Sequence, residues 1–226
     1  MEDKSLSISF ADSLTDDAIS CISDYAEIGL DAIMDDGILK DIPIVSTAIA
    51  VYKIGSSIKE RYNIKKLLVF LNELNKGIPR GRKRQEYQQK FQSDEKFRNR
   101  EIEYLLVLID RYISYDKPRM LANLYLAYLE GVINWETLTV YAEIIDRFLP
   151  GDFQELQRGS RYDLHYLKAS DALIRLVSMG LLVEHSKGIS VNNTCGSLNF
   201  PDLEQKDYEL TTFGSKLIEI LSNMER

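Results

Sequence analysis

Residues 165–185 read HYLKASDALIRLVSMGLLVEH, and the character of the chain changes within this stretch. Its first part is typical of a helix, and Gly180 is a natural end because glycine can leave a helix in a left-handed conformation. Leu182–His185 are a short strand candidate, and Tyr208–Thr211 are another one after a polar stretch. We therefore predict a helix over 165–180 that is followed by a short β hairpin.

The sequences around the two strand candidates, SMGLLVEH at 178–185 and YELTTFGSKLIEIL at 208–221, resemble those of winged-helix domains. With two preceding helices, the resemblance covers about 118–226. The packing logic agrees with it, because Leu181 and Leu182 enter the first strand as an apolar pair. The resemblance implies a domain that binds DNA or docks a protein partner.

The rest of the chain is predicted to be helical, with breaks at glycine and proline. Gly77 ends the helix with the clearest apolar stripe, and an interruption is expected near Ser93. The expected helices cover about 15–36, 43–58, 59–75, 83–115, 118–131 and 134–149. We predict a mainly α fold, with a helical region over 1–116 and a winged-helix-like domain with a short β hairpin over 117–226.

The composition is that of a folded protein with a substantial core. Of the 226 residues, 45% are hydrophobic and 28% are charged, which is typical of globular chains. Cys21 and Cys195 lie far apart, so reduced thiols are a simpler interpretation than a disulfide scaffold. The acidic N-terminus has no apolar signal core. We therefore expect a cytoplasmic protein.

The net charge of −7 hides a strong asymmetry along the chain. Residues 1–41 carry 11 acids and 2 bases, whereas residues 42–100 carry 14 bases and 5 acids. An acidic head with a net charge of −9 therefore precedes a basic middle with a net charge of +9. This pattern indicates either internal charge matching or an anionic partner for the basic part.

The sequence shows no sign of an enzyme. The two histidines, His165 and His185, do not form metal-ligand spacing with the two distant cysteines. Phosphate-binding loops, nucleophile elbows and zinc-protease motifs do not occur. We therefore predict a protein without catalytic activity, metal or cofactor.

Nucleic-acid binding is one open interpretation of the basic residues. In the predicted helix, Lys168 and Arg175 are the candidate phosphate contacts, but Asp163 and Asp171 offset their charge. A second cluster lies beside the aromatic residues Tyr87 and Phe91, which could stack on bases. Its candidate contact residues are Arg80, Arg82, Lys83 and Arg84.

The apolar stretch IPIVSTAIAVY at 42–52 has three interpretations. A membrane span is the least favoured, because a span needs about 20 residues. The stretch suits a buried core helix, and it also suits a helix that is sequestered in the fold and released onto an anionic membrane or a protein partner. The candidate membrane- or partner-binding residues are Ile42, Ile44, Val45, Ile49, Val51, Lys53, Lys59, Arg61, Lys65 and Lys66.

These patterns together predict a non-enzymatic interaction protein. Residues 24–40 and 42–74 resemble a group of bacterial proteins without an established activity. The step from −9 to +9 around a short apolar helix suggests, by analogy, a phage-defence or stress effector in which residues 38–66 act on a membrane or a protein partner. The alternative is a winged-helix regulator that binds DNA. A protein partner is the first expectation, followed by an anionic membrane and then DNA. The oligomeric state stays open.

Overall fold

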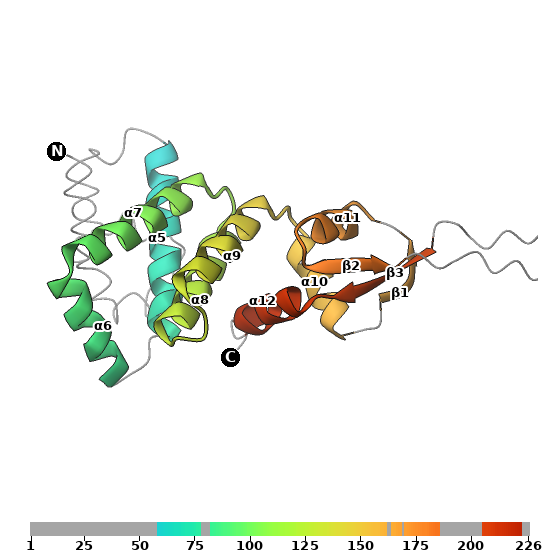
Figure 1. Ribbon diagram of the computed structural model, residues 1–226. Coiled ribbons are helices and arrows are strands. Elements are labelled where there is room, and N and C mark those ends of the chain that lie inside the picture. Colours follow the sequence, from blue (N-terminus) through green and yellow to red (C-terminus); the bar gives the residue numbers. More distant parts are fainter. Residues whose placement is uncertain (1–57, 78–81, 162–163, 169, 186–204, 223–226) are drawn as a thin grey trace, which may run out of the picture. The chain divides into compact units, whose positions relative to one another are not determined.

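The computed structural model describes residues 58–77, 82–161, 164–168, 170–185 and 205–222 (Figure 1). Within these ranges the chain is mainly helical, as predicted, with a small antiparallel sheet. The predicted helices at 15–36 and 43–58 lie outside the described residues, apart from Ile58. None of the described helices is both long enough and apolar enough to cross a lipid bilayer.

The chain divides into two compact units, Met1–Asp146 and Arg147–Arg226. Lys117, near which the sequence predicted a boundary, lies in the first unit, in the first turn of a helix. The described helices that begin in the first unit are α5 (Ile58–Gly77), α6 (Arg82–Ser93), α7 (Glu95–Arg111), α8 (Asp116–Leu129) and α9 (Trp135–Arg147).

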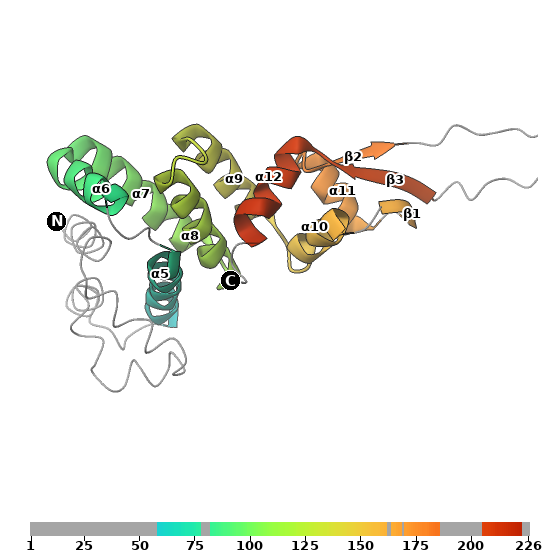
Figure 2. The same ribbon diagram turned by 90° about the horizontal axis from the view of Figure 1, so that it is seen from below.

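Helix α5 holds the core of the first unit together. The predicted apolar stripe is confirmed, because its members recur at helical spacing and each of them is buried: Ile64, Leu67, Leu68, Leu71 and Leu74. Each such side chain contributes roughly 1.5–3 kcal/mol relative to an exposed position. Helix α5 packs most extensively against α8 and also contacts α7. Figure 2, which looks along α5, places α7 and α8 on the same side of it.

The predicted interruption near Ser93 is confirmed as a sharp corner between α6 and α7. Asp94 is extended and caps α7, since its side chain accepts a hydrogen bond from the Phe97 backbone N–H at 3.0 Å. A second hydrogen bond joins the two helices, because the Arg98 guanidinium of α7 donates to the Phe91 carbonyl oxygen of α6 at 3.2 Å. The corner thereby fixes the start of α7.

The second unit combines helices with a three-stranded sheet. Its described elements are α10 (Asp152–Arg161), β1 (Leu164–Lys168), α11 (Asp171–Ser178), β2 (Leu182–His185), β3 (Gln205–Leu210) and α12 (Thr212–Ser222). The strand order is β1-β3-β2, and both pairs are antiparallel. The predicted hairpin is confirmed, because Leu182 lies opposite Leu210 and His185 lies opposite Asp207.

The prediction of one helix over 165–180 is wrong in its first part. Residues Leu164–Lys168 form β1, and Lys168 pairs with Gln205 of β3. The helix begins only at Asp171, because Ser170 is extended and its Oγ accepts a hydrogen bond from the Leu173 N–H at 3.2 Å. A local cap and a distant strand partner therefore override the helical pattern.

Two glycines position the elements around β2. Gly180 has a φ of +73°, as predicted for the residue that leaves the helix. Gly214, in the first turn of α12, lies against the backbone of Leu181. A Cβ added at Gly214 would be 2.3 Å from the Leu181 carbonyl oxygen. The Thr211 Oγ1 accepts a hydrogen bond from the Gly214 N–H at 2.8 Å. Only glycine allows this close approach without a shift of the backbone.

Candidate functional site

Most of the predicted membrane- or partner-binding residues lie outside the described part of the chain: Ile42, Ile44, Val45, Ile49, Val51 and Lys53. The others lie on α5, where Lys59 is exposed near the start of the helix and Arg61 follows within the same turn. The Nζ of Lys65 lies 5.8 Å from the centre of the Tyr115 ring.

Lys66, another of the predicted membrane- or partner-binding residues, lies inside the first unit and not on its surface. The residue is only 1% exposed. Its Nζ donates hydrogen bonds to the carbonyl oxygens of Asp110 and Tyr112, each at 2.8 Å, at the C-terminus of α7. These carbonyls have no partner within their own helix, and the helix dipole favours a cation there. Burial lowers the pKa of Lys66, and the nearby Asp110 opposes this effect.

The predicted nucleic-acid cluster at the centre of the chain is only partly described. Arg80 lies outside the described residues. Arg82, Lys83 and Arg84 form the first turn of α6. Phe91, which was expected to stack on bases, is 1% exposed and belongs to the core. The cluster therefore lacks this stacking partner.

The two candidate phosphate contacts of the second unit do not share a helix. Lys168 lies on β1, whereas Arg175 lies on α11. The Arg175 guanidinium is bound at two points by the carboxylate of Asp152, a fully buried residue of α10. This carboxylate and its hydrogen bond raise the pKa of Arg175. The expected use of Arg175 as a phosphate contact is therefore not supported by its environment.

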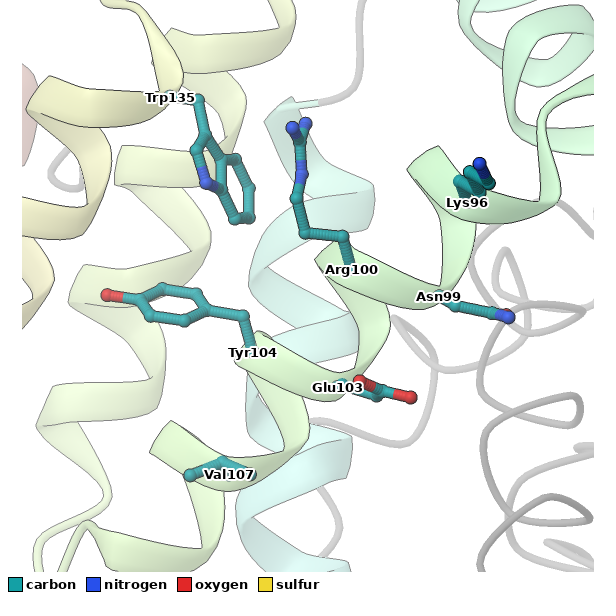
Figure 3. A pocket seen from close by; sticks show the side chains of 7 residues that line it. All are labelled: Lys96, Asn99, Arg100, Glu103, Tyr104, Val107 and Trp135. Carbon is teal, nitrogen blue, oxygen red and sulfur yellow. The ribbon is translucent and has the colours of Figure 1, made fainter.

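The described residues form a different surface feature, an open groove between α7 and the start of α9 (Figure 3). Its volume is about 620 Å³. The residues that line this groove are Lys96, Asn99, Arg100, Glu103, Tyr104, Val107 and Trp135. Six of them lie on α7 and recur at helical spacing, so they form one face of that helix.

Trp135 is the centre of an aromatic cluster in the groove. Figure 3 shows that the side chains of Arg100 and Tyr104 both reach toward its indole ring. The Arg100 guanidinium carbon lies 4.8 Å from the ring centre of Trp135, which is a cation–π distance. Tyr104 and Tyr128 approach the same ring edge-on, with centre distances of 5.4 and 5.5 Å.

The buried carboxylate of Glu101 lies next to this aromatic cluster and is hydrogen-bonded to one of its members. Glu101 is fully buried and accepts hydrogen bonds from the hydroxyl groups of Tyr125 at 2.5 Å and Tyr128 at 2.7 Å. Burial raises the pKa of Glu101, and the two tyrosine hydrogen bonds oppose this effect. Because Tyr128 also contacts Trp135, the network holds the indole ring in place.

Tyr104 is fixed by its own hydroxyl group. This group donates a hydrogen bond to the Thr139 carbonyl oxygen of α9 at 3.3 Å. Partial burial raises the pKa of Tyr104 to about 12, so the hydroxyl stays protonated near neutral pH. Tyr104 therefore presents its ring to the groove rather than a reactive oxygen.

The chemistry of the groove is that of binding. It offers two cations, a carboxylate, an amide, two aromatic rings and the apolar side chain of Val107. Across the described ranges, no group of three or more His, Cys, Asp or Glu side chains is placed to hold a metal ion. The groove supplies stacking, charge and apolar contact on one accessible surface.

None of the residues that line this groove was predicted from the sequence as a site residue. The local signal for it was weak, because Arg100 and Tyr104 lie in a helix dominated by its apolar residues. Trp135 is the single tryptophan of the chain, and it lies far from α7 in the sequence. Only the packing of α7 against the start of α9 brings these side chains together.

No protein-family model, curated protein or solved structure matches this chain. The assignment of a function therefore rests on the chemistry of the described residues.

Proposed function

We propose that this chain is a non-enzymatic interaction protein and that the α7–α9 groove binds a protein partner. One observation carries the proposal: the exposed guanidinium of Arg100 stacks on Trp135 beside Tyr104. Tryptophan, tyrosine and arginine are the residue types that dominate the energetics of protein interfaces. Here all three meet at one accessible place.

The surroundings of the cluster support a protein rather than a small-molecule ligand. Val107 is 58% exposed at one end of the groove, which leaves apolar surface in contact with water. Lys96 and Glu103 supply a polar rim around the aromatic centre. The groove is open, whereas small-molecule sites usually enclose most of the ligand surface.

The groove is a different binding site from residues 38–66, the segment that the sequence predicted to act on a partner. Residues 38–57 lie outside the described part of the chain, and Lys66 is committed to the end of α7. A role in phage defence or stress stays a prediction from the sequence, and so does membrane association.

Site-specific crosslinking in cells tests the proposal. A photoreactive amino acid replaces Val107 in the full-length chain, and a matched control carries it at Val183, an exposed residue of β2. We expect a discrete protein adduct from position 107 that is absent from position 183. The captured protein is then identified and purified, and we expect Tyr104→Ala to weaken its binding by at least about tenfold. Equal labelling from both positions would reject the groove as a docking site.

A DNA-binding regulator is the second candidate. The observation that favours it is the order of α11, β2 and β3, with β1 on the far side of β3. The exposed face of α11 disfavours DNA binding, because Asp171 and Ile174 on this face cannot neutralise phosphates. Arg175 of the same helix pairs with Asp152.

A mobility assay with duplex DNA at two salt concentrations separates the two candidates. A regulator that binds through the second unit should show steep salt dependence and should lose affinity on Lys168→Glu. Lys216→Glu, an exposed position on α12, is the matched charge control. Weak binding that both changes affect equally would reject the regulator.

A further inference from the structure

We propose that the α7–α9 groove selects an acidic segment of its partner. This inference rests on the proposed function and names the chemistry of the ligand. A carboxylate of the partner binds Arg100 and Lys96, and an apolar side chain of the same segment packs on Tyr104 and Val107.

The charge at one end of the groove favours an anion. Lys96 and Arg100 are one helical turn apart on α7, and both are exposed. Two cations lie within cation–π distance of the Phe97 ring. Lys90 Nζ is 4.0 Å from the ring centre, and the Arg100 guanidinium carbon is 5.6 Å from it. Three cations therefore gather near the start of α7.

Arg100 keeps the capacity to bind a carboxylate. Its Nη2 forms an ion pair with buried Glu101 at 3.8 Å, beyond hydrogen-bond range, and its side chain also interacts with Tyr128. The Arg100 side chain is nevertheless 53% exposed. The guanidinium has five N–H donors, and its carbon lies over the Trp135 ring at 4.8 Å from the ring centre. The exposed part of the guanidinium therefore suits a charge-assisted contact with a carboxylate, beside the ring of Trp135.

The other end of the groove requires a different group. Val107 lies seven residues beyond Arg100, which corresponds to roughly 10 Å along the helix. The partner should therefore present an acidic and an apolar side chain about 10 Å apart. In a helical segment this separation is about seven residues, and in an extended segment it is about three.

The same groove is less suited to a nucleic acid. Glu103 lies between the cationic end and Val107, where its carboxylate would repel successive phosphates. In a protein ligand, Glu103 and Asn99 can instead accept or donate hydrogen bonds to backbone groups or to a basic side chain. The mixture of one acid, two cations and one apolar residue is that of a protein interface rim.

The fluorescence of Trp135 provides a direct test, because it is the only tryptophan in the chain. The full-length protein is titrated with a tryptophan-free, alanine-based helical peptide that carries Glu and Leu about seven positions apart. A second peptide has Lys in place of Glu, and a third probe is single-stranded oligothymidine. We expect a saturable change in emission with the acidic peptide and at least about tenfold weaker binding of the Lys peptide.

Matched variants link any binding to the groove. Arg100→Gln should weaken the acidic peptide by at least about tenfold. Arg119→Gln removes an equally exposed arginine from α8, outside the groove, and should leave the affinity unchanged. Circular dichroism of both variants confirms that they keep the helical fold.

The outcomes distinguish the two levels of the proposal. Equal binding of the acidic and Lys peptides, or no binding of either, overturns the acidic inference. If crosslinking from Val107 still captures a protein partner, the proposed function stands without it. Acidic-peptide binding that Arg100→Gln does not affect also overturns the inference, and so does tighter, Arg100-dependent binding of oligothymidine. Failure of both the titration and the crosslinking rejects the proposed function as well.

Discussion

The guanidinium of Arg175 and the buried carboxylate of Asp152 form a two-point ion pair that joins α11 to α10. The Nη2–Oδ1 distance is 2.6 Å and the Nε–Oδ2 distance is 3.1 Å. The same carboxylate accepts a hydrogen bond from the Leu149 N–H at 2.8 Å, just before α10 begins. Asp152 therefore ties together an entering loop and two helices, and Arg175 has a structural role in the second unit.

We expect Asp152→Asn to lower the midpoint of thermal unfolding of the second unit. The change removes the counter-charge of Arg175 and weakens the hydrogen bond to Leu149. Asp171→Asn is the control, since it alters an exposed acid in the first turn of α11. Thermal unfolding followed by circular dichroism should show a clearly larger decrease for Asp152→Asn. Equal midpoints for the two variants would contradict the structural role of the pair.

Lys66→Met should destabilise the first unit. Methionine keeps the apolar stem but cannot donate to the carbonyl oxygens of Asp110 and Tyr112, which would lose a buried partner. We expect a loss of about 1–3 kcal/mol in the free energy of unfolding, measured by urea denaturation. Lys59→Met removes an exposed charge from the same helix and should change stability by less than about 0.5 kcal/mol. Comparable effects of the two changes would show that the end of α7 does not depend on Lys66.

The sequence predicted the fold where the signal is local. Gly180 ends its helix, Asp94 interrupts the run near Ser93, and the apolar stripe of α5 is buried, because each depends on residues within one or two turns. The first strand was missed for the opposite reason. Lys168 pairs with Gln205, and a pairing over such a distance in sequence leaves no local periodicity.

The candidate site was harder to predict, since charge in a sequence does not reveal burial. Lys66 follows other basic residues and reads as surface, but the C-terminus of α7 encloses it. Arg175 reads as a phosphate contact, although Asp152 binds it. The groove depends on Trp135 lying beside Arg100, and only tertiary packing produces that contact.

Gly214→Ala should destabilise the second unit. The new Cβ would lie 2.3 Å from the Leu181 carbonyl oxygen, so α12 must move away from the strand that begins at Leu182. We expect a loss of about 1–3 kcal/mol, as for other overpacked positions. Ser215→Ala, at the next and exposed position of α12, should stay within about 0.5 kcal/mol of the wild type. Urea denaturation measures both, and an unchanged Gly214→Ala variant would show that the close approach is not required.

The buried Glu101 should make the stability of the first unit depend on pH. Its folded-state pKa is raised, because burial disfavours the carboxylate more than the hydrogen bonds from Tyr125 and Tyr128 favour it. The stabilising contribution of Glu101 is therefore fully present below the unfolded-state pKa and is lost as pH rises through the folded-state pKa.

Glu101→Gln removes this titration while keeping an oxygen that can accept from a tyrosine hydroxyl. We expect the free energy of unfolding of the wild type, minus that of Glu101→Gln, to decrease as pH rises from about 4 to about 7. Urea denaturation at each pH gives this difference, and Glu103→Gln provides the reference curve for the loss of an exposed carboxylate from α7. A difference that increases with pH would mean that the tyrosine hydrogen bonds outweigh burial, so that the ionised carboxylate stabilises the support beneath Trp135.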